Sequence, residues 1–301
     1  MMKPGSFASE YSFLPKTIPL VKTPPIKCQG IKTKSVKFIS SNIRWNGNGK
    51  WVEPFLGSGV VLFNIAPRHV VASDLNEHII NFYKSIQDHD IDHKIVRDFL
   101  EWEGKRLEDR DGEIYYEIRD RFNKKHDPLD LLFLSRACFN GVMRFNGKGA
   151  FNTPYNHKPV RFSQSYVTKI VNQVRFVSNV MDGKDWKFVS GDWRDQLRDL
   201  SDQDFVYADP PYYGRHTDYY GHWADHDDDS LARVLTELNC GFALSSWKEN
   251  QYRKNGQIDL HWNKFIVKEF SHFYHVGSLE DYRNPMIEAL VIKPGSENNQ
   301  L

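Results

Sequence analysis

Two glycines between a strand-like run and a helical run constrain the fold of this chain more than any other feature. Residues 51–55 (Trp-Val-Glu-Pro-Phe) have the composition of a buried strand, and residues 56–59 (Leu-Gly-Ser-Gly) turn the chain directly into the apolar helical pattern of residues 60–65. A second strand-like run, residues 69–73, is followed by another helical pattern. This β-α-β-α order predicts a mainly parallel sheet with helices packed on its faces.

The alternation stops in the middle of the chain and returns towards its end. Helical patterns dominate at residues 91–106, 113–123, 128–139 and 162–181. Strand-like runs resume at residues 186–190, 205–208, 242–245, 265–270 and 286–292. We therefore expect an α/β domain, made of residues 24–90 and 182–293, that is interrupted by a mostly helical insertion, residues 91–181, with flexible ends at residues 1–23 and 294–301.

The positive charges of the chain are concentrated in two segments. The 301 residues carry a net charge of only +1, but residues 1–50 contain nine Lys or Arg and a single acid, and residues 136–181 contain seven and no acid. Two basic, acid-poor surfaces on a nearly neutral protein favour contact with the phosphate backbone of a nucleic acid.

Several classes of protein are disfavoured by the composition. Residues 1–4 are not followed by the apolar region of a secretory signal, and no apolar run approaches about 18 residues, so we expect a cytoplasmic protein. Cys28, Cys138 and Cys240 are too widely spaced for a disulfide framework or a cysteine zinc site. The twelve histidines form no H-E-x-x-H pattern, and we expect no catalytic metal.

Asp209-Pro210-Pro211-Tyr212 directly follows the strand-like run of residues 205–208. In open α/β sheets, ligands collect at the carboxyl ends of strands. Two prolines stiffen this turn, so a carboxylate and a carbonyl can accept both hydrogens of an exocyclic amino group while the tyrosine ring stacks on its base. The tetrapeptide therefore favours an active-site loop that grips a planar amine. An ordinary solvated Pro-Pro turn is the alternative.

The glycine turn indicates a nucleotide or nucleoside ligand. Gly57 and Gly59 lack a Cβ, so their backbone can approach a ligand closely. Asp74, at the end of the next strand, stands where dinucleotide-binding folds hold ribose hydroxyls. A three-glycine pyrophosphate fingerprint is absent because Val60 follows directly, which counts against NAD.

In this order the motifs resemble the Dam-type adenine-N6 DNA methyltransferases of the α group. The similarity spans residues 24–292 and rests on residues 25–32, 54–59, 73–76, 136–146, 149–154 and 209–212. Residues 213–216 and 273–277 are similar to modification methyltransferases of the EcoRV type within that family. The resemblance implies a Rossmann-like methyltransferase sheet that binds S-adenosyl-L-methionine (AdoMet), and a DNA-recognition role for the helical insertion.

The resemblance also implies which residues bind the cofactor. They are Phe55, Gly57 and Gly59 at the methionine moiety, Asp74 at the ribose hydroxyls, and Asp192 and Trp193 at the adenine ring. Lys32 matches the lysine of the amino-terminal cofactor motif. Cys28 replaces an aromatic residue expected beside the cofactor, which leaves one wall of the adenine pocket undefined.

Catalysis of this kind needs positioning rather than a strong base. Hydrogen bonds from the adenine N6 amino group to Asp209 and to the Pro210 carbonyl would bias N6 towards tetrahedral geometry, in line with the methyl group of AdoMet. The adenine must leave the duplex stack, at a cost of roughly a few kcal/mol, and would then stack on Tyr212. Residues 213–223 are expected to form a lid over it, and a surface loop without a catalytic part is the alternative.

Residues 140–156, a Gly- and Asn-rich stretch that suits a hairpin, resemble the DNA-contacting hairpin of the family. Arg144 is expected to bind a guanine edge and Lys27 a second guanine, while Val142 or Met143 wedges between bases. The other expected DNA contacts are Asn140, Asn146, Lys158 and Arg161, the last two to phosphates. A basic hairpin that only positions DNA is the alternative.

We predict methylation of adenine N6 in double-stranded DNA, within a palindrome such as GATATC or GATC. One alternative is a cytosine-N4 or RNA amino-methyltransferase, for which Ser or Asn at position 209 would be the stronger signal. Another is an inactive DNA-binding module of the same fold. The expected partners are DNA and a restriction endonuclease that acts on the same site without binding this chain. We expect a monomer, because one subunit is enough to modify one DNA strand at a time.

Overall fold

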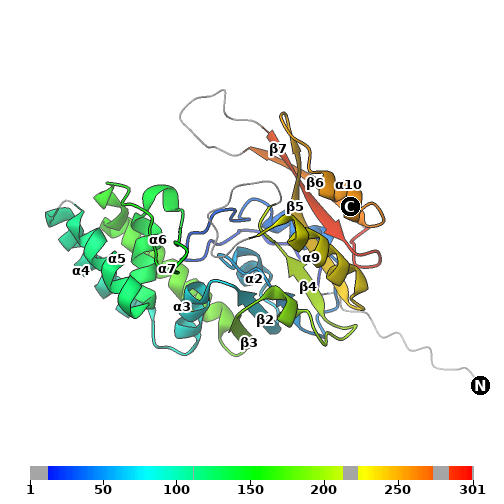
Figure 1. The fold of residues 1–301 in the computed structure, drawn as a ribbon. Coiled ribbons are helices and arrows are strands. Elements are labelled where there is room, and N and C mark those ends of the chain that lie inside the picture. The colour runs from blue at the N-terminus through cyan, green and yellow to red at the C-terminus, as the bar shows by residue number, and fades with distance from the viewer. Residues whose placement is uncertain (1–12, 111, 213–222, 274–284, 300–301) are drawn as a thin grey trace, which may run out of the picture.

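The computed structural model describes residues 13–110, 112–212, 223–273 and 285–299, and its centre is a seven-stranded sheet (Figure 1). The strand order is β3-β2-β1-β4-β5-β7-β6. The strands are β1 Trp51–Glu53, β2 His69–Asp74, β3 Asp185–Ser190, β4 Phe205–Ala208, β5 Gly241–Asn250, β6 Ile266–Phe273 and β7 Pro285–Ile292. Strands β1 to β5 pair in parallel, and β7 runs antiparallel to both of its neighbours. The predicted Rossmann-like α/β fold is therefore confirmed.

The order of the strands reverses between β1 and β4, which pair directly although they are far apart in the sequence. Ligands of open α/β sheets bind outside the carboxyl ends of strands at such a switch point. The glycine turn after β1, Asp74 at the end of β2 and Asp209 after β4 consequently reach the same edge of the sheet.

Alternate side chains of the strands enter two separate cores. Trp51, Phe205 and Tyr207 belong to one core, and their rings stack across β1 and β4 with centroids 5.3 and 5.9 Å apart. Val52 and Val206, one residue along in each strand, belong to the other core. This two-residue period covers the sheet on both faces. Helices α1 Val36–Asn42, α2 Val60–Ile65 and α3 Glu77–Gln87 supply the first core, and α8 Trp193–Gln196, α9 Asp225–Glu237 and α10 Gly256–His261 flank the second.

Four helices between β2 and β3 group at one end of the sheet (Figure 1). They are α4 His93–Asp109, α5 Glu113–Lys125, α6 Pro128–Ala137 and α7 Gln164–Met181. Two 3-10 turns, Phe139–Gly141 and Pro159–Phe162, lie between α6 and α7. Asp92 caps α4 by accepting the backbone N–H of Lys94, and Asp127 caps α6 before Pro128. The helices agree with the predicted ranges to within three residues, and the largest difference is at the end of α4, which continues to Asp109.

A buried ion-pair network holds these helices together. The Arg121 guanidinium of α5 binds Glu103 of α4 at 3.1 Å and Asp130 of α6 at 2.5 Å. Glu103 and Asp130 are almost completely buried. The apolar residues of the four helices are continuous with the core beneath α3, so the insertion packs against α3 and shares the core of the sheet domain.

Parts of both terminal segments are packed, unlike the flexible ends that we expected at residues 1–23 and 294–301. Leu14 is fully buried and exchanges backbone hydrogen bonds with Trp45. Asn298 donates its backbone N–H to Asn42, and Ser296 accepts one from Arg44. Short polar segments of this kind become ordered when backbone partners satisfy them, a condition that composition does not reveal. Among the described residues, no helix is both long and apolar enough to cross a membrane.

Candidate active site

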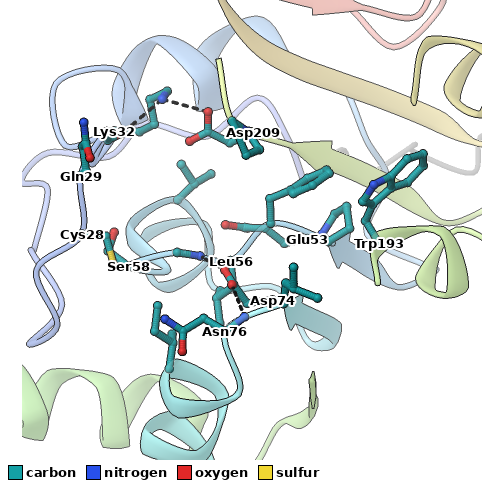
Figure 2. A pocket seen from close by; sticks show the side chains of 18 of the residues that line it. Cys28, Gln29, Lys32, Glu53, Leu56, Ser58, Asp74, Asn76, Trp193 and Asp209 are labelled. Atoms are coloured by element: carbon teal, nitrogen blue, oxygen red, sulfur yellow. Dashed lines mark hydrogen bonds and ion pairs between the residues drawn. The ribbon is translucent and has the colours of Figure 1, made fainter. Parts of the chain in front are cut away.

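A pocket opens at the carboxyl ends of β1, β2 and β4 and beside the segment that follows β3 (Figure 2). It is lined by most of the predicted catalytic and cofactor residues, namely Lys32, Phe55, Gly57, Asp74, Asp192, Trp193, Asp209 and Pro211. Gly59, Pro210 and Tyr212 are described but lie outside that lining.

The two glycines after β1 have different surroundings. Gly57 has φ +51°, lines the pocket, and has open space where a Cβ would project. Gly59 has φ +68°, and a Cβ there would lie 2.6 Å from the Phe63 ring. Gly57 therefore fits the predicted close approach to a ligand, whereas Gly59 is required by packing at the start of α2.

Asp74 is fixed by two backbone donors. One carboxylate oxygen accepts the N–H of Gly57 at 2.8 Å, and the other accepts the N–H of Asn76 at 2.9 Å. Burial raises the pKa of Asp74, and these two hydrogen bonds oppose that shift. Each carboxylate oxygen keeps a second acceptor site, so Asp74 can still bind hydroxyl groups in the pocket.

Lys32 occupies the space between the Asp209 carboxylate and the Tyr212 ring. Its Nζ lies 2.8 Å from Asp209 Oδ1, the ion pair that Figure 2 marks with a dashed line. The same Nζ lies 4.6 Å from the centroid of the Tyr212 ring. Burial by itself would lower the pKa of Lys32, but Asp209 and Tyr212 raise it well above its ordinary value. Burial raises the pKa of Asp209 to about 6, and Lys32 limits that rise. Tyr212 Oη donates a hydrogen bond to Glu288 at 3.3 Å.

Glu53 is a pocket residue that the sequence analysis missed. It ends β1, is 2 % exposed, and accepts a hydrogen bond from Trp51 Nε1 at 3.0 Å. Burial raises the pKa of its carboxyl to about 8, and the Trp51 hydrogen bond opposes the shift. An acid inside the apolar run of residues 51–55 was the available signal.

Three aromatic rings form one side of the pocket. The Phe55 ring lies 6.1 Å from Trp193 and 5.5 Å from Trp223. Cys28 lines a different part, and in Figure 2 it lies beside Ser58, away from Trp193. The aromatic surface is therefore supplied by the segments after β1 and β3, and the position of Cys28 carries no ring.

Arg194 holds the predicted adenine contact, a feature that sequence reasoning also missed. Its guanidinium binds Asp192 at 3.0 Å and Asp227 at 2.6 Å, and it lies over the Trp193 ring at 4.4 Å. Asp192 also caps α8 by accepting the N–H of Arg194. The pairing joins the segment after β3 to the start of α9.

The predicted hairpin at residues 140–156 consists of isolated antiparallel bridges, Cys138 with Tyr155 and Phe145 with Phe151, instead of continuous strands. Asn146 Oδ1 accepts the N–H groups of Lys148 and Ala150, so this side chain closes the turn. Asn140 is exposed with φ +54°, a conformation that Asn tolerates.

Side chains of the hairpin point in two directions. Arg144 Nε donates to Asn152 Oδ1 at 3.3 Å on the opposite arm. Met143 lines the pocket and is 9 % exposed, while its neighbour Val142 is half-buried. The hairpin thus reaches from the surface to the candidate active site.

Basic side chains gather beside the hairpin. Burial lowers the pKa of Lys27 to about 8, and the neighbouring cations Arg161 and Arg136 add to that effect. A Cβ on Gly141 would lie 3.2 Å from Lys27 Cδ, so the lysine stem packs on the hairpin turn. Lys158 is exposed. The structure therefore brings Lys27 and Arg161 together, as a site for an anion requires.

Most of the expected lid, residues 213–222, lies outside the described residues. The two segments of the EcoRV-type similarity, residues 213–216 and 273–277, lie outside them as well, except for residue 273. Of the lid, only Trp223 is described, and its ring packs on Phe55.

A family model and individual proteins that are similar to this chain are all methyltransferases. A family model described as D12 class N6 adenine-specific DNA methyltransferase matches residues 29–276. The chain is 33% identical over 209 residues to the Type II methyltransferase M.MjaIII of Methanocaldococcus jannaschii, covering 63% of this chain and 68% of that protein. It is 29% identical over 168 residues to the DNA adenine methylase of Escherichia coli K12, covering 54% of this chain and 55% of that protein.

The chain thus spans about two thirds of the first relative and about half of the second. Among solved structures, an rRNA methyltransferase aviRa from Streptomyces viridochromogenes covers 98% of this chain and 94% of its own. Its TM-score is 0.35 at 11% identity, a likeness too weak to carry an argument.

Proposed function

The chain belongs to the D12 class of N6 adenine-specific DNA methyltransferases, and we propose that it transfers a methyl group from AdoMet to N6 of an adenine at a specific site in double-stranded DNA. The relative M.MjaIII is named as a Type II methyltransferase, which supports a role in restriction-modification. On this proposal a restriction endonuclease with the same site is a functional partner, the enzyme acts as a monomer, and it works on DNA in the cytoplasm.

The placement of the Lys32 ammonium carries the proposal. An N–H donor already lies between the Asp209 carboxylate and the face of Tyr212, at 2.8 Å and 4.6 Å. A flipped adenine makes the same two contacts, through its N6 amino group and its ring. The Lys32 ammonium must then move away from Asp209 and Tyr212 when the base enters the pocket. We therefore assign Lys32 to the target-base side of the pocket as well as to its cofactor motif.

Asp209 and the Pro210 carbonyl would accept the two N6–H hydrogens and orient the nitrogen lone pair towards the methyl group. AdoMet supplies a methyl group activated by its sulfonium charge. N6 would gain positive charge as it takes the methyl group, and it would then lose one of its two protons to solvent. The Asp209 carboxylate would stabilise the positive charge that develops on N6. Pro211 keeps the turn rigid, and Tyr212 holds the base plane.

The pocket residues fit AdoMet. Asp74 has acceptor sites for ribose hydroxyls, and the open side of Gly57 lets the backbone approach the methionine moiety. Phe55 and Trp193 offer apolar surface for that moiety and for the adenine ring. Asp192 would accept a hydrogen bond from the adenine amino group of the cofactor. The ion pair with Arg194 fixes the orientation of the Asp192 carboxylate. Gly59 supports this site indirectly, because it shapes the turn.

The basic hairpin would read the DNA. Arg144 would bind a guanine edge and Lys27 a second guanine, with Val142 or Met143 inserted between bases. Asn140 would lie near the flipped adenine, and Asn146 would keep the turn in shape beside the DNA. Lys158 and Arg161 would bind phosphates. The target is proposed as a palindrome that begins with GAT, either GATATC or GATC.

Transfer of labelled methyl groups tests the function directly. Purified protein is incubated with labelled AdoMet and mixed DNA duplexes, and the digested nucleosides are separated. We expect label in N6-methyladenine. Label in N4-methylcytosine, or label only when RNA is offered, would favour the amino-methyltransferase alternatives.

The Asp209→Ala variant separates catalysis from binding. We expect it to lose at least about 100-fold in turnover, as removal of one charge-stabilising group does in other enzymes. Its affinity for AdoMet should stay within about threefold of the wild type, because Asp209 faces the target base. An active variant would contradict the assignment, and a wild type that binds DNA without any transfer would support the inactive module.

A further inference from the structure

Three metal-ligating side chains meet outside the catalytic residues. Glu77 and His78 begin helix α3, and His126 follows the last residue of helix α5. Each offers one ligand atom, and the three atoms lie within 4.8 Å of one another. The sequence predicts no catalytic metal, and this cluster takes no part in the chemistry of the proposed transfer.

His78 is the rigid member of the cluster. Its side chain is 3 % exposed, and its ring packs against Phe122 at 4.9 Å and almost parallel to Phe145 at 5.4 Å. Its backbone N–H is held by the Asn76 cap. The His126 ring approaches it edge to face, with centroids 4.6 Å apart. One imidazole is therefore fixed in place before any ion arrives.

Glu77 and His126 can adjust to an ion because both are exposed. Bonds of about 2.0–2.2 Å from zinc to nitrogen or oxygen require ligand atoms about 3–3.5 Å apart. The ligand atoms lie up to 4.8 Å apart, so they must move closer by roughly 1 Å. Exposed side chains make such shifts by small changes of rotamer. Two imidazoles and one carboxylate suit a transition metal better than Mg²⁺, which prefers oxygen ligands.

Charges around the site act in both directions, because the amino end of α3 at Glu77 carries partial positive charge. Glu77 contributes a negative charge, and the carbonyl end of helix α5 at His126 carries partial negative charge. Lys124 and Lys125 oppose it, but both are exposed and therefore screened by solvent.

We propose that Glu77, His78 and His126 form a Zn²⁺ site that clamps the start of α3 to the end of α5. The residue before the site, Asn76, belongs to the turn that fixes Asp74 in the pocket. Phe145, which stacks on His78, follows Arg144 in the hairpin. The ion would therefore join the cofactor turn to the DNA-recognition insertion.

Zinc titration of the untagged full chain, after removal of metal by a chelator and dialysis, tests the proposal. We expect calorimetry to show one high-affinity Zn²⁺ equivalent, Co²⁺ to give the visible absorption of a site with nitrogen ligands, and Mg²⁺ to give no comparable heat. Zn²⁺ should also raise the melting temperature, because it binds only the folded chain.

The decisive variant is His126→Asn, with His89→Asn as its matched control. Both histidines are exposed with left-handed backbone, φ +55° and +65°, a conformation that Asn also adopts. We expect His126→Asn to weaken Zn²⁺ binding by at least about tenfold, since even outer-shell changes at metal sites cost about 10–100-fold. His89→Asn should bind as the wild type does.

Glu77→Gln provides a second variant whose folding does not depend on the left-handed position, and we expect it to weaken binding as well. Absence of a high-affinity Zn²⁺ equivalent in the wild type would show that His78 and His126 only pack against each other and would overturn the proposal. Binding retained by both His126→Asn and Glu77→Gln would place the ion elsewhere and overturn it equally.

Discussion

At the scale of single residues, opposing influences set the charge of Asp209. Burial favours its neutral form, while the ammonium of Lys32 at 2.8 Å favours the carboxylate. On the proposed function, the target base would displace Lys32, and its N6 amino group would then donate to Asp209. The carboxylate is therefore ready to accept hydrogen bonds near neutral pH and loses this capacity in mild acid.

Activity is expected to fall in acid because the pKa of Asp209 is raised from 3.8 to about 6. Protonation below that value removes an acceptor of the N6–H hydrogens. We expect kcat/KM for DNA to fall about tenfold for each pH unit below the pKa. Initial rates at low DNA concentration, measured from about pH 5 to about pH 8, check this. A profile that stays flat through this range contradicts the role of Asp209.

Glu53 is expected to make the folded protein less stable as pH rises. The pKa of its carboxyl is about 8 in the folded chain and 4.5 in the reference state, so the unfolded chain releases a proton that the folded chain retains. Stability is unaffected below pH 4.5 and declines from there towards pH 8, by at most about 3 kcal/mol at neutral pH.

Glu53→Gln should remove that decline while keeping an acceptor for Trp51 Nε1. The measurement is the difference in melting temperature between variant and wild type as a function of pH, with the exposed Glu237→Gln as control. We expect the difference to grow in favour of Glu53→Gln as pH rises. A constant difference would show that Glu53 is already ionised in the folded protein.

At the scale of elements, the hairpin depends on helix α5 for its position. Asn123 of α5 accepts the backbone N–H of Phe151 at 2.8 Å and donates to its carbonyl at 3.1 Å. Thr153 accepts the backbone N–H of Arg144 at 3.0 Å. These side-chain contacts take the place of a regular ladder, which the Gly- and Asn-rich turn does not form.

Arg144→Ala should affect sequence recognition more than general DNA binding. Loss of a bidentate guanine contact costs about 1–3 kcal/mol of discrimination. We expect the affinity for a cognate duplex to fall by about tenfold or more, with little change for a non-cognate duplex of the same length. The control is Lys158→Ala, a proposed phosphate contact, which should weaken both equally. Equal losses for Arg144→Ala would support the alternative that the hairpin only positions DNA.

At the scale of the whole molecule, the distribution of charge matters more than its sum. The net charge is +1, yet residues 136–181 contain no acid. The fold brings part of this segment next to Lys27 from the other basic stretch, since Lys27 packs on Gly141 and lies near Arg161. A nearly neutral protein can thus present one basic surface beside its active site.

DNA binding should weaken steeply with salt, because each phosphate contact releases condensed counterions. We expect Arg161→Ala to lower the slope of log affinity against log salt by about one, the loss of a single phosphate contact. Lys187→Ala, an exposed change on β3 outside both basic segments, should leave the slope unchanged. Fluorescence anisotropy over a range of salt concentrations gives the measurement. Equal slopes for wild type and Arg161→Ala would show that Arg161 makes no phosphate contact.

The sequence by itself determined the strands, most helices and the order of the motifs. The strand at residues 205–208 and the helix predicted at residues 128–139, observed at Pro128–Ala137, are examples, since their local patterns were not overridden by packing. The carboxyl ends of parallel strands share one edge, so Asp74 and Asp209 could be placed at one site before any coordinates.

Only the tertiary structure decided which distant side chains meet. Lys32 reaches Asp209, Arg194 links Asp192 to Asp227, and Gly59 lies against the Phe63 ring. Local patterns are readable because hydrogen bonds and side-chain periodicity act over a few residues. Contacts between remote side chains depend on strand order, helix packing and burial, which the whole chain sets together.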